Sequence, residues 1–418
     1  MTASATSTDI RIANRRKVLR AVYGHKEISK QGISQALSMS LPTVTQNLKE
    51  IEAMGLIERR GLYESTGGRK AHIYHFVSRA RIALGVVLLK EFYRIAAVDL
   101  YGNVLKSEVF QVPFSRTEDY FQGLGREIRD FAWEAVQRRE EKRAEDKEKA
   151  EAESKAEAGP ETGAGDQRES GTQIQGEILP WKQQILGVSI AIQGLVSNDG
   201  SAVIYGEILG CTGLKLQEIQ RAVDFPCTLI HDTEASAIAE MWFRKSKKDA
   251  VLLSLNRNFG GALIVNGDVH RGQEFSSSVI EHMRLYPEGR PCYCGKKGCM
   301  EAYCSANALQ QEAGEPLKQF FQAMRSGCRE RTAVWHRYLR NLAMGINNIR
   351  MLFDCEYIIG GYLHSFMEEQ DFFLLAQYAK EECSFQSTDI RLVHSAFTDD
   401  SAAPGAGIFL VKRFLNSF

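Results

Sequence analysis

Apolar residues recur at helical spacing in three successive segments near the start of the chain. The pattern predicts a helix over residues 10–23, a short helix after Ser29, and a longer helix over residues 41–54 after Ser40. Serine at these two positions supports the helix starts, because its hydroxyl oxygen can accept a hydrogen bond from a free backbone N–H of the first turn. The apolar stripes of the three helices are Ile12, Val18, Leu19 and Val22; Ile33, Ala36 and Leu37; and Val44, Leu48 and Ile51.

A β-hairpin is expected over residues 56–76, with its turn at residues 65–68. A short helix, a tight turn, a longer helix with polar residues near its start and a following hairpin are typical of a winged helix-turn-helix domain, here residues 1–78. The longer helix would meet base edges in the major groove, and the hairpin would meet phosphates or the minor groove. The candidate DNA-contacting residues are Thr43, Thr45, Gln46, Asn47 and Lys49 on the helix and Arg59, Arg60, Gly68, Arg69 and Lys70 on the hairpin. The alternative is a small helical module that binds another protein.

From about residue 80 the pattern changes to short apolar runs separated by Gly-containing turns, such as IALGVVLL and ILGVSIAIQGLV. Strand-like runs that alternate with helical stretches predict an α/β architecture. Residues 138–170 contain no large apolar side chain, so we expect a solvated helix that fades into disorder, inserted between two structured elements. The longest apolar run, residues 82–89, is too short to span a bilayer, which argues against a membrane protein.

The formal net charge is zero, with 52 basic and 52 acidic residues among 418. The two signs are unevenly distributed, because residues 1–78 carry 12 Lys or Arg and six Asp or Glu, a charge of +6, which leaves −6 on the rest. The basic excess therefore lies in the segment that is expected to meet DNA. Nine cysteines, three of them crowded together, indicate a reducing compartment and a metal rather than a disulfide framework, so we expect a cytoplasmic protein.

The segment EHMRLYPEGRPCYCGKKGCMEAYCS concentrates ligands for a soft metal ion. Cys292, Cys294 and Cys299 lie on a glycine-containing loop, and His282 precedes the first of them by ten residues. Three thiolates and one imidazole suit a tetrahedral Zn²⁺ with no open position, which indicates a structural zinc site. Cys304 is the alternative fourth ligand. The competing interpretation is that these cysteines are merely buried or redox-active.

Taken together, these motifs resemble the ROK family of repressors, open reading frames and sugar kinases. The resemblance rests on the metal-binding loop with Glu301 directly after Gly-Cys-Met, on the segments IAIQGLV, HDTEASAIAE and NGDVHRG, on IIGG at residues 358–361, and on GAGIFL near the C-terminus. It implies an actin-like α/β fold of the hexokinase type with two lobes, here residues 79–200 and 201–418, and C-terminal helices that return toward the first lobe. The winged head with its GGRKA turn is similar to that of sugar-responsive ROK repressors, and kinases of the family lack such a head.

The resemblance also locates two phosphate-binding loops, and both depart from the family pattern. The Asp-x-Gly-Gly-Thr turn of the kinases corresponds here to Val87, Leu89, Lys90 and Glu91, and the second loop corresponds to residues 256–262, where two glycines remain. Without glycine the backbone cannot approach a phosphate closely, and Glu91 would repel one. These departures predict that the chain is not a kinase and not an enzyme.

The sugar-binding side of the family pattern is partly retained. The resemblance implies that Asp232 holds a sugar hydroxyl. It also implies that Glu301 retains a Glu of the family pattern, whereas Val279 replaces a sugar-binding Glu. Loss of one charge-assisted hydrogen bond costs about 1.5–3 kcal/mol, so an ordinary hexose should bind poorly. Either the ligand differs, or Glu281 and Glu234 supply other polar groups, or the pocket is purely structural. The candidate ligand-binding residues are Gly194, His231, Asp232, Glu281, His282 and Glu301.

The sequence therefore predicts a DNA-binding transcriptional regulator, acting as a repressor, that responds to a carbohydrate or related small molecule bound in a kinase-like cleft. Its expected partners are this effector and double-stranded DNA with a palindromic operator. We also expect a homodimer or a dimer of dimers, because two-fold protein symmetry matches a palindrome. Three alternatives remain, namely a ROK-type sugar kinase, a ligand-independent DNA-binding protein and a metal-responsive one.

Overall fold

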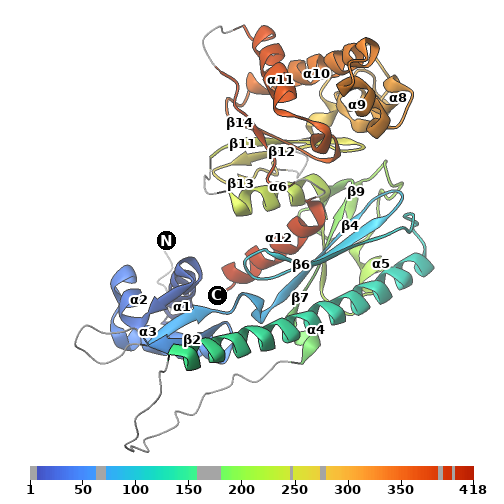
Figure 1. Ribbon diagram of the computed structural model, residues 1–418. Coiled ribbons are helices and arrows are strands. Elements are labelled where there is room, and N and C mark those ends of the chain that lie inside the picture. The colour runs from blue at the N-terminus through green and yellow to red at the C-terminus, as the bar shows by residue number, and fades with distance from the viewer. Residues whose placement is uncertain are drawn as a thin grey trace, which may run out of the picture.

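The chain forms a small head and two larger lobes, and its C-terminus lies beside the head (Figure 1). The computed structural model describes residues 7–62, 72–157, 180–244, 248–273, 279–384, 389–397 and 401–418. The head and each lobe contain a β-sheet with helices packed against it. Among the helices of these residues, none combines the length and the apolar character that a membrane span requires.

The head contains three helices and three short strands, which are α1 (Ser7–His25), β1 (Glu27–Ser29), α2 (Lys30–Leu37), α3 (Leu41–Ala53), β2 (Ile57–Leu62) and β3 (His72–Phe76). The strands pair antiparallel in the order β1-β3-β2, so the predicted hairpin strands are present and β1 adds a third strand. Both predicted caps are confirmed. The Ser29 hydroxyl accepts a hydrogen bond from the Gly32 amide at 3.0 Å, and the Ser40 hydroxyl accepts one from the Thr43 amide at 3.4 Å.

The predicted apolar stripes supply most of the core of the head. The buried members are Val18, Leu19, Val22, Ile33, Val44, Leu48 and Ile51. Ile12 and Leu37 are half-buried and Ala36 is exposed, so the stripe of α2 is narrower than its sequence suggested. Between α2 and α3, Ser38 adopts a left-handed φ of 51°, which makes the tight turn of the helix-turn-helix unit.

The first lobe is built on a five-stranded sheet whose members are β4 (Ile82–Leu88), β5 (Tyr93–Val98), β6 (Val104–Phe110), β7 (Ile185–Ile192) and β10 (Cys227–His231). Their order is β10-β7-β4-β5-β6, with β4, β5 and β6 antiparallel and with β7 and β10 parallel to β4. Alternate residues of β4 face opposite sides. Leu84 and Val86 pack with α4 (Glu118–Glu157), and Ala83 packs with α12 (Ala402–Asn416).

The first lobe extends further along the chain than the expected boundary at residue 200. β10 pairs with β7, so the lobe continues to His231 before the chain crosses to the second lobe. α12 returns to the first sheet, where a Cβ at Gly85 would lie 1.8 Å from the Ala403 carbonyl oxygen. The smaller elements of this lobe are η1 (Ser78–Ala80), η2 (Trp181–Gln184), β8 (Leu195–Val196), β9 (Val203–Tyr205) and α5 (Leu216–Gln220).

α4 continues into the polar insertion that was expected over residues 138–170. The last α4 residue in the core of the first lobe is Val136, two residues before the insertion begins. Residues 138–157 are helical, as predicted for the start of the insertion, and residues 158–170 lie outside the described residues.

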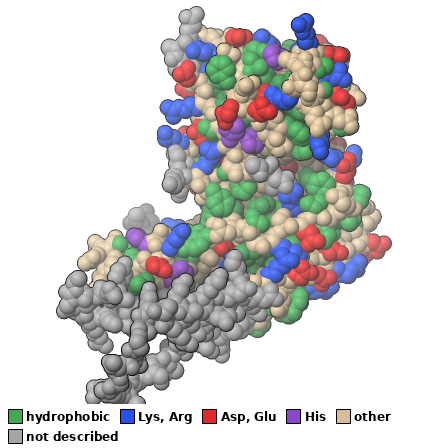
Figure 2. Space-filling view, in the orientation of Figure 1, with side chains coloured by type: hydrophobic (Ala, Val, Ile, Leu, Met, Phe, Trp, Pro, Cys, Tyr) green, Lys and Arg blue, Asp and Glu red, His purple; other side chains and the backbone are tan. Residues whose placement is uncertain are grey.

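The second lobe contains a mixed sheet in the order β13-β12-β11-β14-β15 and an all-helical layer. Its strands are β11 (Ala250–Leu255), β12 (Phe259–Val265), β13 (Asp268–Val269), β14 (Glu356–Gly360) and β15 (Leu392–His394). α6 (Asp232–Phe243) covers one face of this sheet. The elements on the other side are η3 (Ile280–His282), α7 (Glu301–Cys304), α8 (Ala306–Ala313), α9 (Leu317–Arg325), α10 (Arg329–Arg350), η4 (Tyr362–Phe366) and α11 (Glu369–Glu381). Acidic and basic side chains are interspersed over the face of this lobe that Figure 2 shows.

An aromatic cluster joins the head to the first lobe. The ring of Tyr23 lies 5.0 Å from that of Phe76 within the head and 4.8 Å from that of Tyr101 in the first lobe. The Tyr23 hydroxyl donates a hydrogen bond to the Leu100 carbonyl oxygen at 3.0 Å. Apolar residues of the head, the first sheet and α12 belong to one continuous core. The head is therefore packed against the body and is not merely tethered to it.

Candidate functional site

The outer face of α3 presents polar side chains to solvent. Gln46 and Lys49 are exposed, and Thr45 is half-buried and donates to the backbone oxygen four residues earlier at 2.7 Å. These three side chains and the first two residues of the helix line a shallow groove. Thr43 is half-buried, with its hydroxyl oxygen 2.8 Å from that of Ser40. This face has the hydrogen-bonding groups and the exposure that contacts with base edges require.

Asn47, a predicted DNA contact, is instead buried, with 5% of its surface exposed. Its Nδ2 donates a hydrogen bond to the Thr43 carbonyl oxygen at 2.8 Å, and its Oδ1 has no partner among the described residues. The position three residues after Val44 and four before Ile51 places Asn47 on the inner face of the helix. The prediction was therefore wrong for this residue, whose amide supports the packing of α3.

Arg59 of β2 is paired within the head. Its Nη2 donates to Glu52 Oε2 at 2.8 Å, and its guanidinium lies 5.8 Å from the ring centre of Tyr74. The Glu52 carboxylate raises the pKa of Arg59. Because 41% of the side chain is exposed, Arg59 can still face a phosphate. The other predicted wing contacts lie outside the described residues: the side chain of Arg60, and Gly68, Arg69 and Lys70.

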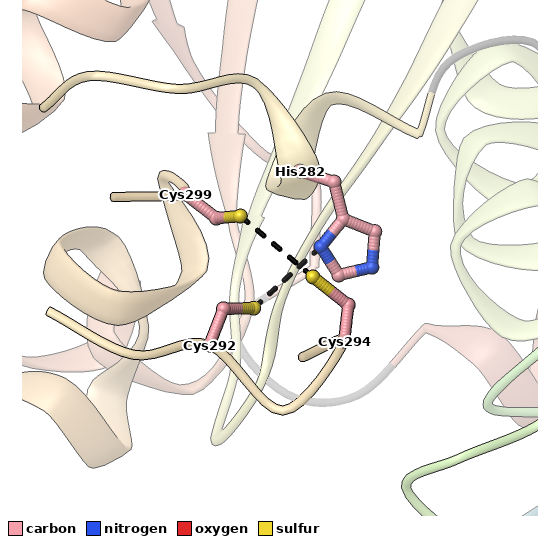
Figure 3. A group of neighbouring side chains, drawn as sticks. All are labelled: His282, Cys292, Cys294 and Cys299. Carbon is pink, nitrogen blue, oxygen red and sulfur yellow. Dashed lines mark hydrogen bonds between the residues drawn. The ribbon is translucent and has the colours of Figure 1, made fainter. Parts of the chain in front are cut away.

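Figure 3 shows the four predicted metal ligands turned toward one another in the second lobe. The ligand atoms of His282, Cys292, Cys294 and Cys299 all lie within 4.8 Å of one another. Cys292 Sγ is 3.6 Å from His282 Nδ1, and the Sγ atoms of Cys294 and Cys299 are 3.8 Å apart. A tetrahedral ion with metal–sulfur bonds of about 2.3 Å separates its sulfurs by about 3.8 Å. The four side chains therefore fit a four-coordinate metal ion.

Tight turns bring the three cysteines of this cluster together. Gly295 and Gly298 have φ angles of 80° and 79°, and a Cβ at Gly298 would lie 1.5 Å from the Tyr286 carbonyl oxygen. Cys304, the alternative fourth ligand, is fully buried in the core of the second lobe and is not part of the cluster. Burial raises the pKa of its thiol. The geometry therefore favours His282 as the fourth ligand.

A cleft between the lobes brings together five of the six candidate ligand-binding residues. These are Gly194, His231, Asp232, Glu281 and His282. Gly194 follows β7. His231 and Asp232 form the junction of β10 and α6, and Glu281 and His282 lie in η3. A Cβ at Gly194 would lie 2.5 Å from the Tyr205 carbonyl oxygen, so glycine allows the chain to pass close to β9. The cleft wall thus takes residues from both lobes.

Glu301, the sixth candidate, is not among the residues that line the cleft. Its Oε1 accepts a hydrogen bond from Asn258 Nδ2 at 2.9 Å, and its Oε2 accepts one from the Phe259 amide at 2.6 Å. Burial raises the pKa of Glu301 to about 7. Both oxygens therefore hold the loop before β12, and this use of the carboxylate replaces the ligand contact that was expected.

Glu281 lines the cleft, whereas Glu234 does not. Glu234 lies in the first turn of α6 and forms an ion pair with Arg271. Glu281 is 7% exposed, and its Oε2 has no hydrogen-bond partner within the described part of the chain. Burial, followed by the nearby carboxylates of Asp232 and Glu301, raises the pKa of Glu281 to about 8. Of the two replacement groups that the sequence offered, Glu281 is the one that lies in the described wall of the cleft.

The sequence interpretation missed several polar and aromatic residues of the cleft: Gln193, Tyr205, Glu207, Thr233, Ser254, Asn256, Asn258 and Tyr293. Asn256 and Asn258 belong to the loop that the resemblance assigned to phosphate. Tyr293 lies between the first two cysteine ligands, with its ring 5.2 Å from that of His282. The Cys-Tyr-Cys spacing was a usable signal, because two cysteines that turn toward a metal turn the residue between them away from it.

An ion pair joins the two loops that correspond to the phosphate loops of kinases. Arg257, between β11 and β12, donates to the carboxylate of Glu91, between β4 and β5, and both side chains are exposed. The two remaining glycines of the second loop lie close to neighbouring side chains. A Cβ at Gly260 would lie 2.5 Å from Thr233 Oγ1, and one at Gly261 would lie 1.9 Å from the side chain of Ile280. The described residues of these loops therefore connect the lobes, and the first loop contains no glycine over residues 87–91.

Comparison with known proteins identifies the family. The ROK family model matches residues 177–413, and a model described as winged helix-turn-helix DNA-binding matches residues 13–58. Because the first match covers more than half of the chain, the chain belongs to the ROK family. The predicted fold class, a winged helix-turn-helix head on a two-lobed body of the hexokinase type, is confirmed.

The relatives include regulators. The DNA-binding transcriptional dual regulator NagC of Escherichia coli K12 is 24% identical over 313 residues, which is 74% of this chain and 66% of NagC, just under two thirds of its length. The xylose repressor of Caldicellulosiruptor bescii is 21% identical over 378 residues, 85% of this chain and 84% of that protein. A crystal structure described as a ROK family transcriptional regulator, homolog of E. coli MLC protein, shares the fold with a TM-score of 0.71 at 22% identity, covering 97% of this chain and 96% of the other.

Proposed function

We propose that this protein is a DNA-binding transcriptional repressor whose activity responds to a small molecule of the carbohydrate class. One observation carries the proposal. The head that exposes the outer face of α3 shares a continuous apolar core with the lobe whose strand β10 ends in the cleft. Ligand-dependent movement of the body is therefore transmitted to the orientation of α3. Named relatives that are regulators, such as NagC and the xylose repressor, support the same function.

The DNA partner in this proposal is a duplex with a palindromic operator. One α3 helix reads only a short half-site, and two heads related by a two-fold axis read a palindrome. We therefore infer a homodimer or a dimer of dimers. Thr45, Gln46 and Lys49 would contact the major groove, with Thr43 at its edge.

The metal in this proposal is a structural Zn²⁺. Three thiolates and one imidazole leave no open position for a substrate or for water, and soft sulfur ligands prefer zinc to calcium or magnesium. When bound, the ion would supply a coordination cross-link between η3 and the cysteine loop. His282 and Tyr293 would thereby be fixed against the cleft.

We infer that the cleft does not transfer phosphate. Phosphoryl transfer depends on a cradle and on positive charge around the phosphates. Here Glu91 brings negative charge to the first loop, and Arg257 is used to pair with it. The kinase-like body would thus serve as a sensor.

Selection of operator sequences from a random duplex library, followed by fluorescence anisotropy, tests the DNA-binding half. Gln46→Ala should weaken binding to the selected operator by about 1–3 kcal/mol and relax base preference at one position. Gln377→Ala, at an exposed helical position of the second lobe, is the matched control and should bind as the wild type does. Binding without any sequence preference would contradict the proposal. The sensing half is tested by measuring operator affinity with and without added carbohydrate. The affinity should fall when the effector is present.

A further inference from the structure

The first turn of α3 exposes apolar side chains to solvent. Leu41 is 42% exposed, and Pro42 beside it is exposed as well. Both residues line the shallow groove on the outer face of α3, together with Thr45, Gln46 and Lys49. Apolar side chains that gather on an exposed surface mark a binding site more often than single ones do. The outer face of α3 is therefore apolar at its start and polar further along.

Thr45 adds a methyl group to this surface. Its hydroxyl donates to the Leu41 carbonyl oxygen at 2.7 Å, one turn earlier in the same helix. A threonine hydroxyl has a single donor, and here the backbone of the helix uses it. Thr45 can therefore offer a partner its methyl group and an acceptor oxygen, but no donor. The side chains of Leu41 and Pro42 and the methyl group of Thr45 are called the apolar strip below.

The charge around the groove favours a negatively charged partner. Lys49 borders the groove, and its described lining contains no Asp or Glu. The acids further along α3 are paired within the head, Glu50 with Arg11 and Glu52 with Arg59. A polyanion can therefore approach the apolar strip, and duplex DNA is the polyanion that a winged helix-turn-helix domain binds.

One group in the major groove of DNA matches the apolar strip. The edges of guanine, adenine and cytosine present hydrogen-bond donors and acceptors there, whereas thymine also presents a methyl group at C5. Apolar side chains and the methyl group of threonine are the protein groups that contact this methyl. Gln46, one turn after Pro42, has an exposed amide that can hydrogen-bond to a neighbouring base. The groove thus combines a surface for a thymine methyl with a polar group for the base beside it.

We propose that Leu41, Pro42 and Thr45 recognise a thymine in each half-site of the operator by packing against its C5 methyl group. The inference rests on the proposed function, since it specifies one base that the same helix reads. It adds an apolar contact to the hydrogen bonding of Gln46, and the two contacts contribute separately to base preference.

Replacement of thymine by deoxyuridine tests the inference, because it removes the methyl group and keeps every hydrogen-bonding group of the base. The operator is the one that the full-length wild-type protein selects from a random duplex library. Each thymine of the half-site is replaced in turn, at both symmetry-related positions, and affinity is measured by fluorescence anisotropy at constant salt. At one position or more, affinity should fall about fourfold for each half-site, as expected for the loss of one buried methyl group.

Two variants assign this loss to the apolar strip. Leu41→Ala removes an exposed apolar side chain, and Thr45→Ser removes one methyl group while it keeps the hydroxyl that bonds to the Leu41 carbonyl oxygen. At the sensitive position, the ratio of thymine affinity to uracil affinity should fall toward one in at least one of the two variants. Ile10→Ala is the matched control, because that side chain is 54% exposed on α1 of the same head and does not line the groove. Its ratio should equal that of the wild type.

The outcomes separate this inference from the function on which it rests. If the protein selects a defined operator that has no thymine in its half-site, or that binds equally well with deoxyuridine at every position, the inference is overturned and sequence-specific DNA binding stands. If no operator is selected, both are overturned. A ratio that keeps its wild-type value in both folded variants also overturns the inference, because another part of the protein then reads the methyl group. If Leu41→Ala does not fold, the ratio of Thr45→Ser decides alone.

Discussion

The guanidinium of Arg20, on the first helix of the head, donates a hydrogen bond of 2.8 Å to Oδ1 of Asn416 at the end of α12. One turn earlier on the same helix, Arg16 donates to the backbone oxygen of Phe418. The head therefore contacts the C-terminal end of a helix whose other end lies deep in the body. These two hydrogen bonds connect α1 directly to the C-terminal end of α12 and the residues that follow it.

α12 also connects this contact to the cleft. It packs along α6 so closely that a Cβ at Gly405 would lie 1.9 Å from the Ala235 carbonyl oxygen. α6 begins at Asp232, which lines the cleft. A shift of α6 on ligand binding would therefore reach the head through one intermediate helix, because tightly packed helices move together.

Arg20→Ala should weaken the response of DNA binding to the effector while changing stability little. The hydrogen bond it removes is exposed, so the free energy of unfolding should fall by less than about 1 kcal/mol. The measurement is operator affinity with and without effector, by fluorescence anisotropy. Lys17→Ala, exposed on the same helix, should respond as the wild type does. An unchanged effector response in Arg20→Ala would show that the signal bypasses α12.

Cys294→Ser should remove the metal and destabilise the second lobe. The loss of one thiolate from a closed four-ligand site leaves the cysteine loop without its cross-link, and metal binding energy contributes directly to folding. Bound zinc, measured by mass spectrometry, should fall from about one ion per chain toward none, and the melting temperature should drop by several degrees. Cys328→Ser, at a half-buried position of the same lobe, should change neither quantity. A chelated wild type with an unchanged melting temperature would contradict a structural metal.

The local features of the fold were accessible from sequence, and the long-range ones were not. The caps at Ser29 and Ser40 and the stripe of α3 depend on residues within four positions, where helical geometry fixes the spacing. β10 was not assigned to the first sheet, because it pairs with β7 far earlier in the chain and such pairing leaves no local periodicity. The cluster of His282 and the three cysteines could be predicted because tetrahedral sulfur ligation constrains the spacing of such residues.

The errors at the candidate site concern polar groups that the protein uses internally. Glu301 was expected to bind ligand, and its carboxylate instead receives two donors from the loop before β12. Asn47 was expected to contact DNA, and its amide instead bonds to the backbone of its own helix. Residue type and spacing indicate what a side chain can bind. Which partner it binds depends on packing, and helical periodicity gave a clue only for Asn47.

Asn47→Ala should lower stability and leave operator preference intact. The replacement removes the hydrogen bond to Thr43 and leaves space in a buried face, so the free energy of unfolding should fall by about 1–2 kcal/mol. Denaturant unfolding measures the stability, and repeated operator selection measures the preference. Gln46→Ala should give the reverse pattern, because that side chain is exposed. A changed base preference at normal stability would return Asn47 to the DNA interface.

Arg257→Ala should favour opening of the cleft, because its ion pair with Glu91 links the two lobes, and the neighbouring Asn256 and Asn258 line the cleft. Both side chains are exposed, so the contribution is below about 1 kcal/mol, and effector affinity should fall by up to about fivefold at low salt. The difference from the wild type should shrink as salt screens the pair. Arg340→Ala, which breaks a similarly exposed pair with Glu381 inside the second lobe, should leave effector affinity unchanged. Equal affinities of Arg257→Ala and the wild type at every salt concentration would show that the ion pair has no part in closing the lobes.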